Sequence, residues 1–430
     1  MVVPQILSSS KPIQSSNEPA GFLKSLGPGL VTGAADDDPS GIATYSQVGA
    51  QFGYGLCWIM LFSFPLMVAI QEISARIGCV TGYGIAKNLR RHYSPWLLRA
   101  VVFLLIVANV INLGADLGAM GAALGLLIGG PEHLYAIVFA LVCILVETFM
   151  SYARYASILK WGTLSLFAYV AVVFAAQVPW GTALYNTFVP HLVFDGPHAM
   201  AVVAILGTTI SPYLFFWQAG QEVEELRRRH VKPLCIAPRD AGAELVRIRT
   251  DTMIGMGVSN VIALFIIFAT AATLNAHGVT EIQTSAQAAE ALRPVAGPFA
   301  FGLFAVGIMA TGMLAVPVLA GSAAYGVSEI FGWTEGLDRQ PREAKAFYGT
   351  IAVATLCGVA LNFSSLDPVK ALYWSAVVNG ILAAPLMAVM MLIATNKRVM
   401  GRLTLTPGIR AVGWVATAVM ALATAGFFFF

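Results

Sequence analysis

Three consecutive carboxylates stand inside an apolar run that extends from Pro28 to about Gly53, namely Asp36, Asp37 and Asp38. Translocon-type scales put the cost of one ionisable residue at the centre of a membrane helix at roughly 2.5–3.5 kcal/mol. Pro39 removes a backbone donor and Gly41 loosens the chain, so free carbonyl groups and half-helix ends are expected beside the carboxylates. These features predict a cation site near the middle of a membrane, with the carboxylates facing water, an ion or a protein-lined cavity.

A second candidate break lies at Ser211 and Pro212, in a hydroxyl-rich segment that runs from Gly207 to Tyr213. A lone proline in a membrane helix is about as often a simple kink as a functional break. Here the break comes five apolar segments after the aspartates, and paired broken helices at corresponding positions mark the substrate site of inverted-repeat transporters. The hydroxyl groups and the Thr208 carbonyl are therefore expected to face the aspartates.

A polar stripe crosses a third apolar segment. Asn109, Asn112 and Asp116 are spaced so that they share one helical face. Interhelical hydrogen bonding is the simpler interpretation of the two asparagines, whereas a mid-membrane carboxylate indicates an ion pathway or a proton relay. For Asn379, one turn after Ser375, a structural role is narrowly favoured over a functional one. Our candidates for a polar pathway or a gate are Asp36, Asn112, Asp116, Tyr213 and Asn379.

The composition indicates a protein embedded in a lipid bilayer. Hydrophobic residues make up 58% of the 430 positions and charged residues only 11%, far below the roughly 25% of an average soluble domain. The net charge of +3 is distributed between apolar segments, which excludes a nucleic-acid-binding patch. The 5 cysteines show no metal-binding spacing. We therefore expect an all-α integral membrane protein.

With about 20 apolar residues for each crossing, the chain is expected to contain eleven transmembrane helices. The predicted spans are Pro28–Gly53, Leu56–Ile77, Leu98–Ile128, Leu134–Met150, Trp161–Val178, Met200–Gln221, Asp251–Leu274, Pro298–Ile330, Ala346–Leu361, Pro368–Thr395 and Ile409–Phe430. Residues 1–26 lack a signal-peptide core and are expected to form a disordered cytoplasmic tail. Residues 27–430 then form one transporter domain, with a first repeat at 27–178, an inverted second repeat at 199–396 and an extra helix at 409–430.

The basic residues predict the orientation of the chain. Of the 25 lysines and arginines, all except Arg293 and Lys370 fall on connections that share the side of the N-terminus. The positive-inside rule places this side in the cytoplasm and the C-terminus outside. A miscounted span would move every later connection to the other side and remove the bias. We expect a multi-pass protein of a bacterial-type inner membrane.

The residues around both breaks resemble the NRAMP family of divalent-metal transporters. The family's first helix carries an Asp-Pro-Gly-Asn motif, to which this chain is similar at Gly27-Pro28-Gly29 and Asp38-Pro39-Ser40-Gly41. Further similarities lie at Gln71 to Gly78, Thr81-Gly82, Ala115-Asp116-Leu117 and Gly207 to Pro212. The resemblance extends from about Gly27 to at least Gly336. It implies an inverted five-plus-five fold that transports divalent cations, usually together with protons.

The departures from the family pattern concern the ligands. Gly41 stands where the family has an asparagine ligand, Ser211 where it has a methionine, and Tyr213 where it has a histidine. Asp116 is kept, but Ala119 stands where the family has a glutamate of its proton route. A thioether favours transition metals over hard cations, and tyrosine does not titrate near neutral pH as histidine does. The changes resemble the divergent NRAMP-related magnesium transporters, in which a wider site holds a more hydrated ion and proton coupling is lost.

The resemblance and the residues together predict a divalent-cation importer that works by alternating access. Mg²⁺ is expected to be favoured and Mn²⁺ to come next, with weak or no proton coupling, because Mg²⁺ is usually held by one or two carboxylates and several retained waters. The expected metal site contains Asp38, Thr208, Ser211, Asp37 and Gly41, with Asp37 or Asp36 in an outer shell. No resident cofactor is expected, and the protein is expected to act as a monomer.

Three alternatives remain open on the sequence alone. The first is a proton-coupled Mn²⁺ or Fe²⁺ transporter of the same family. The second is an organic-solute symporter of the same fold, which three aspartates disfavour because they repel a substrate carboxylate. The third is an intramembrane aspartyl enzyme in which Asp38 and Asp116 share a proton. The positive-inside pattern and the paired breaks favour a transporter over an enzyme.

Overall fold

The computed structural model describes residues 28–150, 163–363 and 367–430, and this part of the chain folds into helices with no strand. The predicted all-α fold class is confirmed. The expected disordered tail at 1–26 and the start of the fifth span at Trp161 lie outside the described residues.

Both predicted breaks divide a span into two helices. The first span consists of α1 (Pro28–Asp36) and α2 (Pro39–Phe52), and the sixth consists of α10 (Gly196–Thr209) and α11 (Pro212–Arg228). In each case a proline occupies the first position of the second helix, where its missing N–H costs nothing and its fixed φ favours helix initiation. The chain therefore stops and restarts a helix at both points.

The remaining helices follow in chain order. They are α3 (Trp58–Thr81), α4 (Ile85–His92), α5 (Pro95–Ile128), α6 (Glu132–Phe149), α8 (Phe167–Ala175), α9 (Trp180–Phe188), α12 (Ala241–Thr273), α13 (Ser285–Glu290), α14 (Arg293–Ala296), α15 (Ala300–Phe331), α16 (Lys345–Leu361), α17 (Pro368–Thr395), α18 (Lys397–Met400) and α19 (Pro407–Phe429). Short 3₁₀ turns lie at Thr163–Leu166, Pro238–Asp240, Asn275–His277 and Gly297–Phe299.

Within the described ranges, 8 helical stretches are long and apolar enough to cross a membrane, with the two halves of the sixth span counted together. The shorter apolar helices Leu164–Ala175 and Lys345–Leu361 fall where two further spans are predicted. The total of eleven remains a prediction. The helix of the seventh span begins ten residues earlier than expected, at Ala241 instead of Asp251. The charged residues there continue the helix beyond its apolar part, because charge shortens a hydropathy signal without ending a helix.

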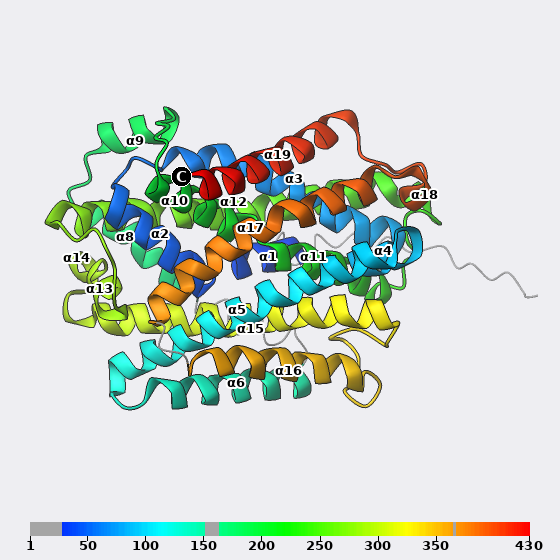
Figure 1. The fold of residues 1–430 in the computed structure, drawn as a ribbon, viewed down its shortest axis with the longest axis horizontal. Helices are drawn as coiled ribbons and strands as arrows, with labels where there is room; N and C mark the ends of the chain where they lie inside the picture. The colour runs from blue at the N-terminus through cyan, green and yellow to red at the C-terminus, as the bar shows by residue number, and fades with distance from the viewer. Residues whose placement is uncertain (1–27, 151–162, 364–366) are drawn as a thin grey trace, which may run out of the picture.

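The contacts between helices repeat with an offset of five spans. α3 packs against α11, and its counterpart α12 packs against α1 and α2. Likewise α5 packs against α6 and α16, while α15 packs against α16 and α6. Figure 1 shows α1 and α11 at the centre of the molecule, between α5 and α15 on one side and α3, α12 and α19 on the other.

The two ends of the helix bundle differ in charge. Helices α4 and α18 lie at one end, and α9, α13 and α14 lie at the other (Figure 1). The first end carries Lys87, Arg90 and Arg91 on α4, and Lys397 and Arg398 on α18. This distribution agrees with the predicted orientation, in which these residues face the cytoplasm.

Candidate metal-ion site

Asp38 caps the second half of the first span. One of its oxygens, Oδ1, accepts hydrogen bonds from the Gly41 backbone N–H and the Ser40 hydroxyl, each at 2.7 Å. A side-chain oxygen at this position satisfies donors that the first turn of a helix leaves free. The local sequence thus holds the carboxylate at the break, where it is only 1% exposed.

The second oxygen of Asp38 connects the break to two other helices. Oδ2 accepts hydrogen bonds from Asn112 Nδ2 on α5 and from the Tyr213 hydroxyl on α11, each at 3.1 Å. Asn112 Oδ1 in turn accepts a hydrogen bond of 3.2 Å from Asn379 Nδ2 on α17. Asp38, Asn112, Tyr213 and Asn379 therefore form one buried polar cluster, which joins both breaks to the third and tenth predicted spans.

Oxygen atoms of both broken helices converge beside Gly41. A Cβ atom placed on this glycine would lie 3.1 Å from Thr208 Oγ1, 3.2 Å from the Asp36 carbonyl oxygen and 3.4 Å from Asp38 Oδ1. Among the described residues, Thr208 Oγ1 is buried without a hydrogen bond of ordinary geometry. The absence of a side chain at Gly41 therefore lets three hard oxygen atoms come close together, and these are the ligand type that Mg²⁺ and Mn²⁺ take.

Ser211 lies at the second break. Its hydroxyl is 2.9 Å from the carbonyl oxygens of both Gly207 and Thr208, in the last turn of α10. The hydroxyl proton is used within the break, and the lone pairs of Ser211 Oγ stay available. Ser211 and the Thr208 carbonyl are therefore hydrogen-bonded to each other, and their role as metal ligands remains a prediction.

Asp36 and Asp37 face a different partner. The Ser259 hydroxyl on α12 lies 2.8 Å from Asp36 Oδ2 and 2.9 Å from Asp37 Oδ1. One hydroxyl has a single proton and cannot donate to both carboxylates, and Asp36 Oδ1 is buried without a partner. No ion pair among the described residues neutralises Asp36, Asp37 or Asp38. The break is therefore a buried concentration of carboxylates without a cationic side chain.

Asp116 lies beside this cluster. It is fully buried on α5, one turn beyond Asn112, and is close enough to the Ser40 backbone and to Asp38 to interact with both electrostatically. Among the described residues, neither of its carboxylate oxygens has a hydrogen bond of ordinary geometry. No hydrogen bond joins it to Asp38 among the contacts of the described chain. In the same described ranges, no group of three or more His, Cys, Asp or Glu side chains is arranged to hold a metal ion. A site at Asp38 therefore has to draw on hydroxyl and carbonyl oxygens.

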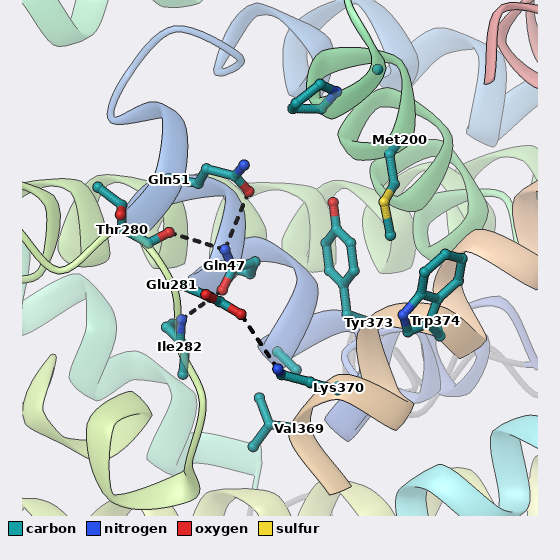
Figure 2. A pocket seen from close by; sticks show the side chains of 13 residues that line it. Gln47, Gln51, Met200, Thr280, Glu281, Ile282, Val369, Lys370, Tyr373 and Trp374 are labelled. Carbon is teal, nitrogen blue, oxygen red and sulfur yellow. Dashed lines mark hydrogen bonds and ion pairs between the residues drawn. The ribbon is translucent and has the colours of Figure 1, made fainter. Parts of the chain in front are cut away.

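A cavity of about 560 Å³, which we call the vestibule, opens at the end of the molecule where α13 lies. Figure 2 shows its walls, which come from α2, the start of α10, the chain between α12 and α13, and the first turns of α17. Ala43, Gln47 and Gln51 line it from one face of α2. Because Ala43 is only two residues beyond Gly41, the vestibule reaches α2 within one turn of the oxygen atoms that converge beside Gly41.

The opposite end is held together by polar contacts. The Gly29 N–H donates to Asp251 Oδ2 at 2.7 Å, and the Thr32 hydroxyl donates to Gln218 Oε1, so that α1 is attached to both α12 and α11. Ion pairs near the same ends of α11 and α12 join Arg247 to Glu222 and Arg229 to Glu244, each at 2.6 Å. The vestibule thus opens at the α13 end, although its described lining does not include Asp38, whereas polar contacts close the end that carries α4.

The structure joins four of the residues predicted from the sequence in one cluster, namely Asp38, Asn112, Tyr213 and Asn379. It also adds contacts from two further residues. Ser40 and Ser259 donate hydrogen bonds to the aspartates, and neither residue is among the site residues predicted from the sequence. Ser40 was detectable as part of an Asp-Pro-Ser-Gly helix cap. Ser259 is a hydroxyl within an apolar helix, and its sequence context carries no signal that it faces α1.

Two helices broken at neighbouring points, with helix contacts that repeat at a five-span offset, define an inverted-repeat membrane transporter. The model of one family, described as "Natural resistance-associated macrophage protein-like", matches residues 29–429. The chain belongs to this family, NRAMP. The prediction of a transporter instead of an enzyme is thereby confirmed.

Individual relatives agree with this assignment. The chain is 26% identical over 426 residues to a "Divalent metal cation transporter MntH" of Klebsiella pneumoniae, with 96% of each chain covered. It is 26% identical to the protein of the same name from Verminephrobacter eiseniae over 66% of this chain and 63% of that one. The solved structure of a manganese transporter from Eremococcus coleocola is similar in fold, with a TM-score of 0.73, 18% identity and coverage of 95% and 87%.

Proposed function

We propose that the protein imports divalent metal cations by alternating access, with Mg²⁺ favoured and Mn²⁺ next. The observation that carries the proposal is the convergence of oxygen atoms of Asp36, Asp38 and Thr208 beside Gly41. Asp38 is the direct or water-mediated ligand. Its four hydrogen-bond donors are all uncharged, so they orient the carboxylate without neutralising it. The names of the relatives from Klebsiella and Verminephrobacter support divalent cations as the substrate class.

The preference for Mg²⁺ rests on hard ligands and on room for water. Ser211 supplies an oxygen where the family pattern has a thioether, and a site without sulfur loses a filter against hard cations. Gly41 has no side chain where the pattern has an asparagine ligand, so one protein ligand is replaced by water in this proposal. Mg²⁺ dehydrates reluctantly and keeps several waters when bound. A site lined by short side chains is therefore expected to favour it. The second candidate is Mn²⁺, which also takes oxygen ligands.

Weak or absent proton coupling is the second part of the proposal. Tyr213 donates to Asp38 from the position where the resemblance places a histidine, and a phenol does not exchange protons near neutral pH. Asp36 and Asp37 concentrate negative charge around Ser259 and attract the hydrated ion. Asp116 and the pair Asn112–Asn379 border the route. In this proposal the vestibule faces the outside of a bacterial-type inner membrane.

An ion-uptake experiment on purified protein in liposomes tests the proposal. Uptake of Mg²⁺, Mn²⁺ and Ca²⁺ is measured for the wild type and for Ser211→Met, with a pH reporter inside the vesicles. We expect Mg²⁺ uptake without matching acidification in the wild type, and a shift toward Mn²⁺ in Ser211→Met. Robust Mn²⁺ uptake with no Mg²⁺ uptake would contradict the magnesium preference. Acidification in step with metal uptake would instead support the proton-coupled alternative.

A further inference from the structure

The entrance of the vestibule holds one pair of opposite charges. Lys370 Nζ lies 3.5 Å from Glu281 Oε1, and the two side chains are 51% and 59% exposed (Figure 2). Among the residues that line the vestibule, these are the only two with charged side chains. The pair connects the chain between α12 and α13 to the first turn of α17. Any cation that enters the vestibule therefore meets this pair.

Glu281 is held in position by its neighbours on both sides. The Gln47 side-chain amide donates to the Thr280 carbonyl oxygen at 3.1 Å and accepts from the Ile282 N–H at 2.9 Å. One side chain of α2 thus fixes the backbone on either side of Glu281, as Figure 2 shows. The face of α2 that carries Gln47 and Ala43 continues one turn further to Pro39, directly after Asp38. The Glu281 carboxylate therefore stands at the outer end of the proposed ion route.

Lys370 is an exchangeable partner for this carboxylate. It lies in the first turn of α17, where the helix dipole disfavours a positive charge. Exposed ion pairs of this kind contribute little to stability and are screened by salt. A divalent cation interacts with a carboxylate twice as strongly as an ammonium group at the same distance and dielectric constant. Exchange of the ammonium group for a divalent cation therefore breaks no buried contact.

We propose that Glu281 is an outer binding site for the incoming hydrated divalent cation and that Lys370 is a tethered competitor for it. The pair then sets the external concentration at which uptake is half-maximal. This inference rests on the proposed function and extends it to the entrance of the route. The two residues act before the ion reaches Asp38, so their effect belongs to KM and not to the maximal rate.

The test is a double-mutant cycle of Mg²⁺ uptake rates in liposomes at low ionic strength. Lys370→Gln frees the carboxylate and is expected to lower KM about twofold to fivefold, the range for a charge acting through water over several ångströms. Glu281→Gln leaves an unpaired ammonium group in the entrance and is expected to raise KM by a similar factor. In the double variant, Lys370→Gln should no longer lower KM as it does beside Glu281. The differences should shrink at about 0.5 M monovalent salt, because the screening length falls to a few ångströms.

Arg293→Gln is the matched control. Arg293 is the other basic residue predicted on this side, pairs with Glu290 at 2.9 Å, and does not line the vestibule, so its KM should stay at the wild-type value. Unchanged KM in both vestibule variants would overturn the inference, and so would equal loss of maximal rate in both, which indicates a structural tie. A wild type that transports no divalent cation would instead contradict the proposed function itself.

Discussion

Asp38 accepts four hydrogen bonds from uncharged donors. The donors are the Gly41 N–H and the side chains of Ser40, Asn112 and Tyr213. Hydrogen bonds to a charged group contribute about 1.5–3 kcal/mol each, which offsets part of the cost of burying the carboxylate. None of these donors is a cation. In the proposed function, the ionised carboxylate attracts the metal ion at the break.

Replacement of Asp38 by asparagine removes the negative charge but retains a side chain that can cap the helix. Asparagine caps helices as well as aspartate does, so we expect Asp38→Asn to fold and to keep its thermal stability. Affinity for Mg²⁺ should fall about a hundredfold or more, since removal of one partner of a buried charge pair costs roughly 3–5 kcal/mol. Isothermal titration calorimetry and uptake assays measure the loss. Unaltered affinity in a folded variant would show that Asp38 is not a ligand.

At the scale of helices, glycines let the broken spans approach their neighbours. A Cβ atom on Gly207 of α10 would collide with the Ala376 carbonyl oxygen and with Gly380 on α17. A Cβ atom on Gly33 of α1 would overlap Gly255 on α12. Close backbone approach through small residues is the usual way in which membrane helices associate, because lipid provides no hydrophobic driving force between them. These contacts fix the positions of both breaks.

Gly207→Ala should therefore destabilise the contact between α10 and α17. Overpacking of a tight interface costs about 1–3 kcal/mol, because either α10 or α17 must shift. The thermal unfolding temperature in detergent should fall, and Mg²⁺ affinity should fall with it, since Thr208 follows directly in the chain. Gly302→Ala on α15 is the control, because a Cβ atom there meets nothing within 4 Å. Equal stability of the two variants would contradict the packing argument.

At the scale of the whole molecule, the two ends carry different interactions. The end with α4 and α18 is basic and is closed by contacts among α1, α11 and α12. The other end contains the vestibule. Access to the Asp38 region from the closed end requires α1 to leave Asp251 and Gln218. This arrangement is what alternating access requires of one of its two end states.

The orientation of the whole molecule can be measured with reporter fusions. We expect a fluorescent protein joined to the N-terminus to be active in the cytoplasm, and a phosphatase that folds only outside the cytoplasm to be active after Phe430. The physical reason is the placement of all but two of the 25 lysines and arginines on one side. Both reporters active on one side would mean an even number of spans and would overturn the count of eleven.

The sequence by itself determined where the two spans break, and it predicts the charge asymmetry and the role of Asp38 as the main ligand. These properties depend on local chemistry: Pro39 and Pro212 start helices, aspartates are costly in lipid, and basic residues stay on one side. Such effects act within one turn or one span, so they can be predicted from the sequence without knowing which helices are neighbours. The predicted start of α12 was wrong for the same reason. The charged segment 241–250 belongs to the helix but not to its apolar part, and the sequence signal reports only the apolar part.

Only the tertiary structure decided which side chains meet. Asn379 and Asp38 are joined through Asn112, although hundreds of positions separate them in the chain, and Ser259 from α12 lies between Asp36 and Asp37. The vestibule pair of Glu281 and Lys370 also depends on two distant segments. These contacts are set by which helices are adjacent and by the rotation of each helix about its axis. Packing fixes both quantities, and no single span encodes either.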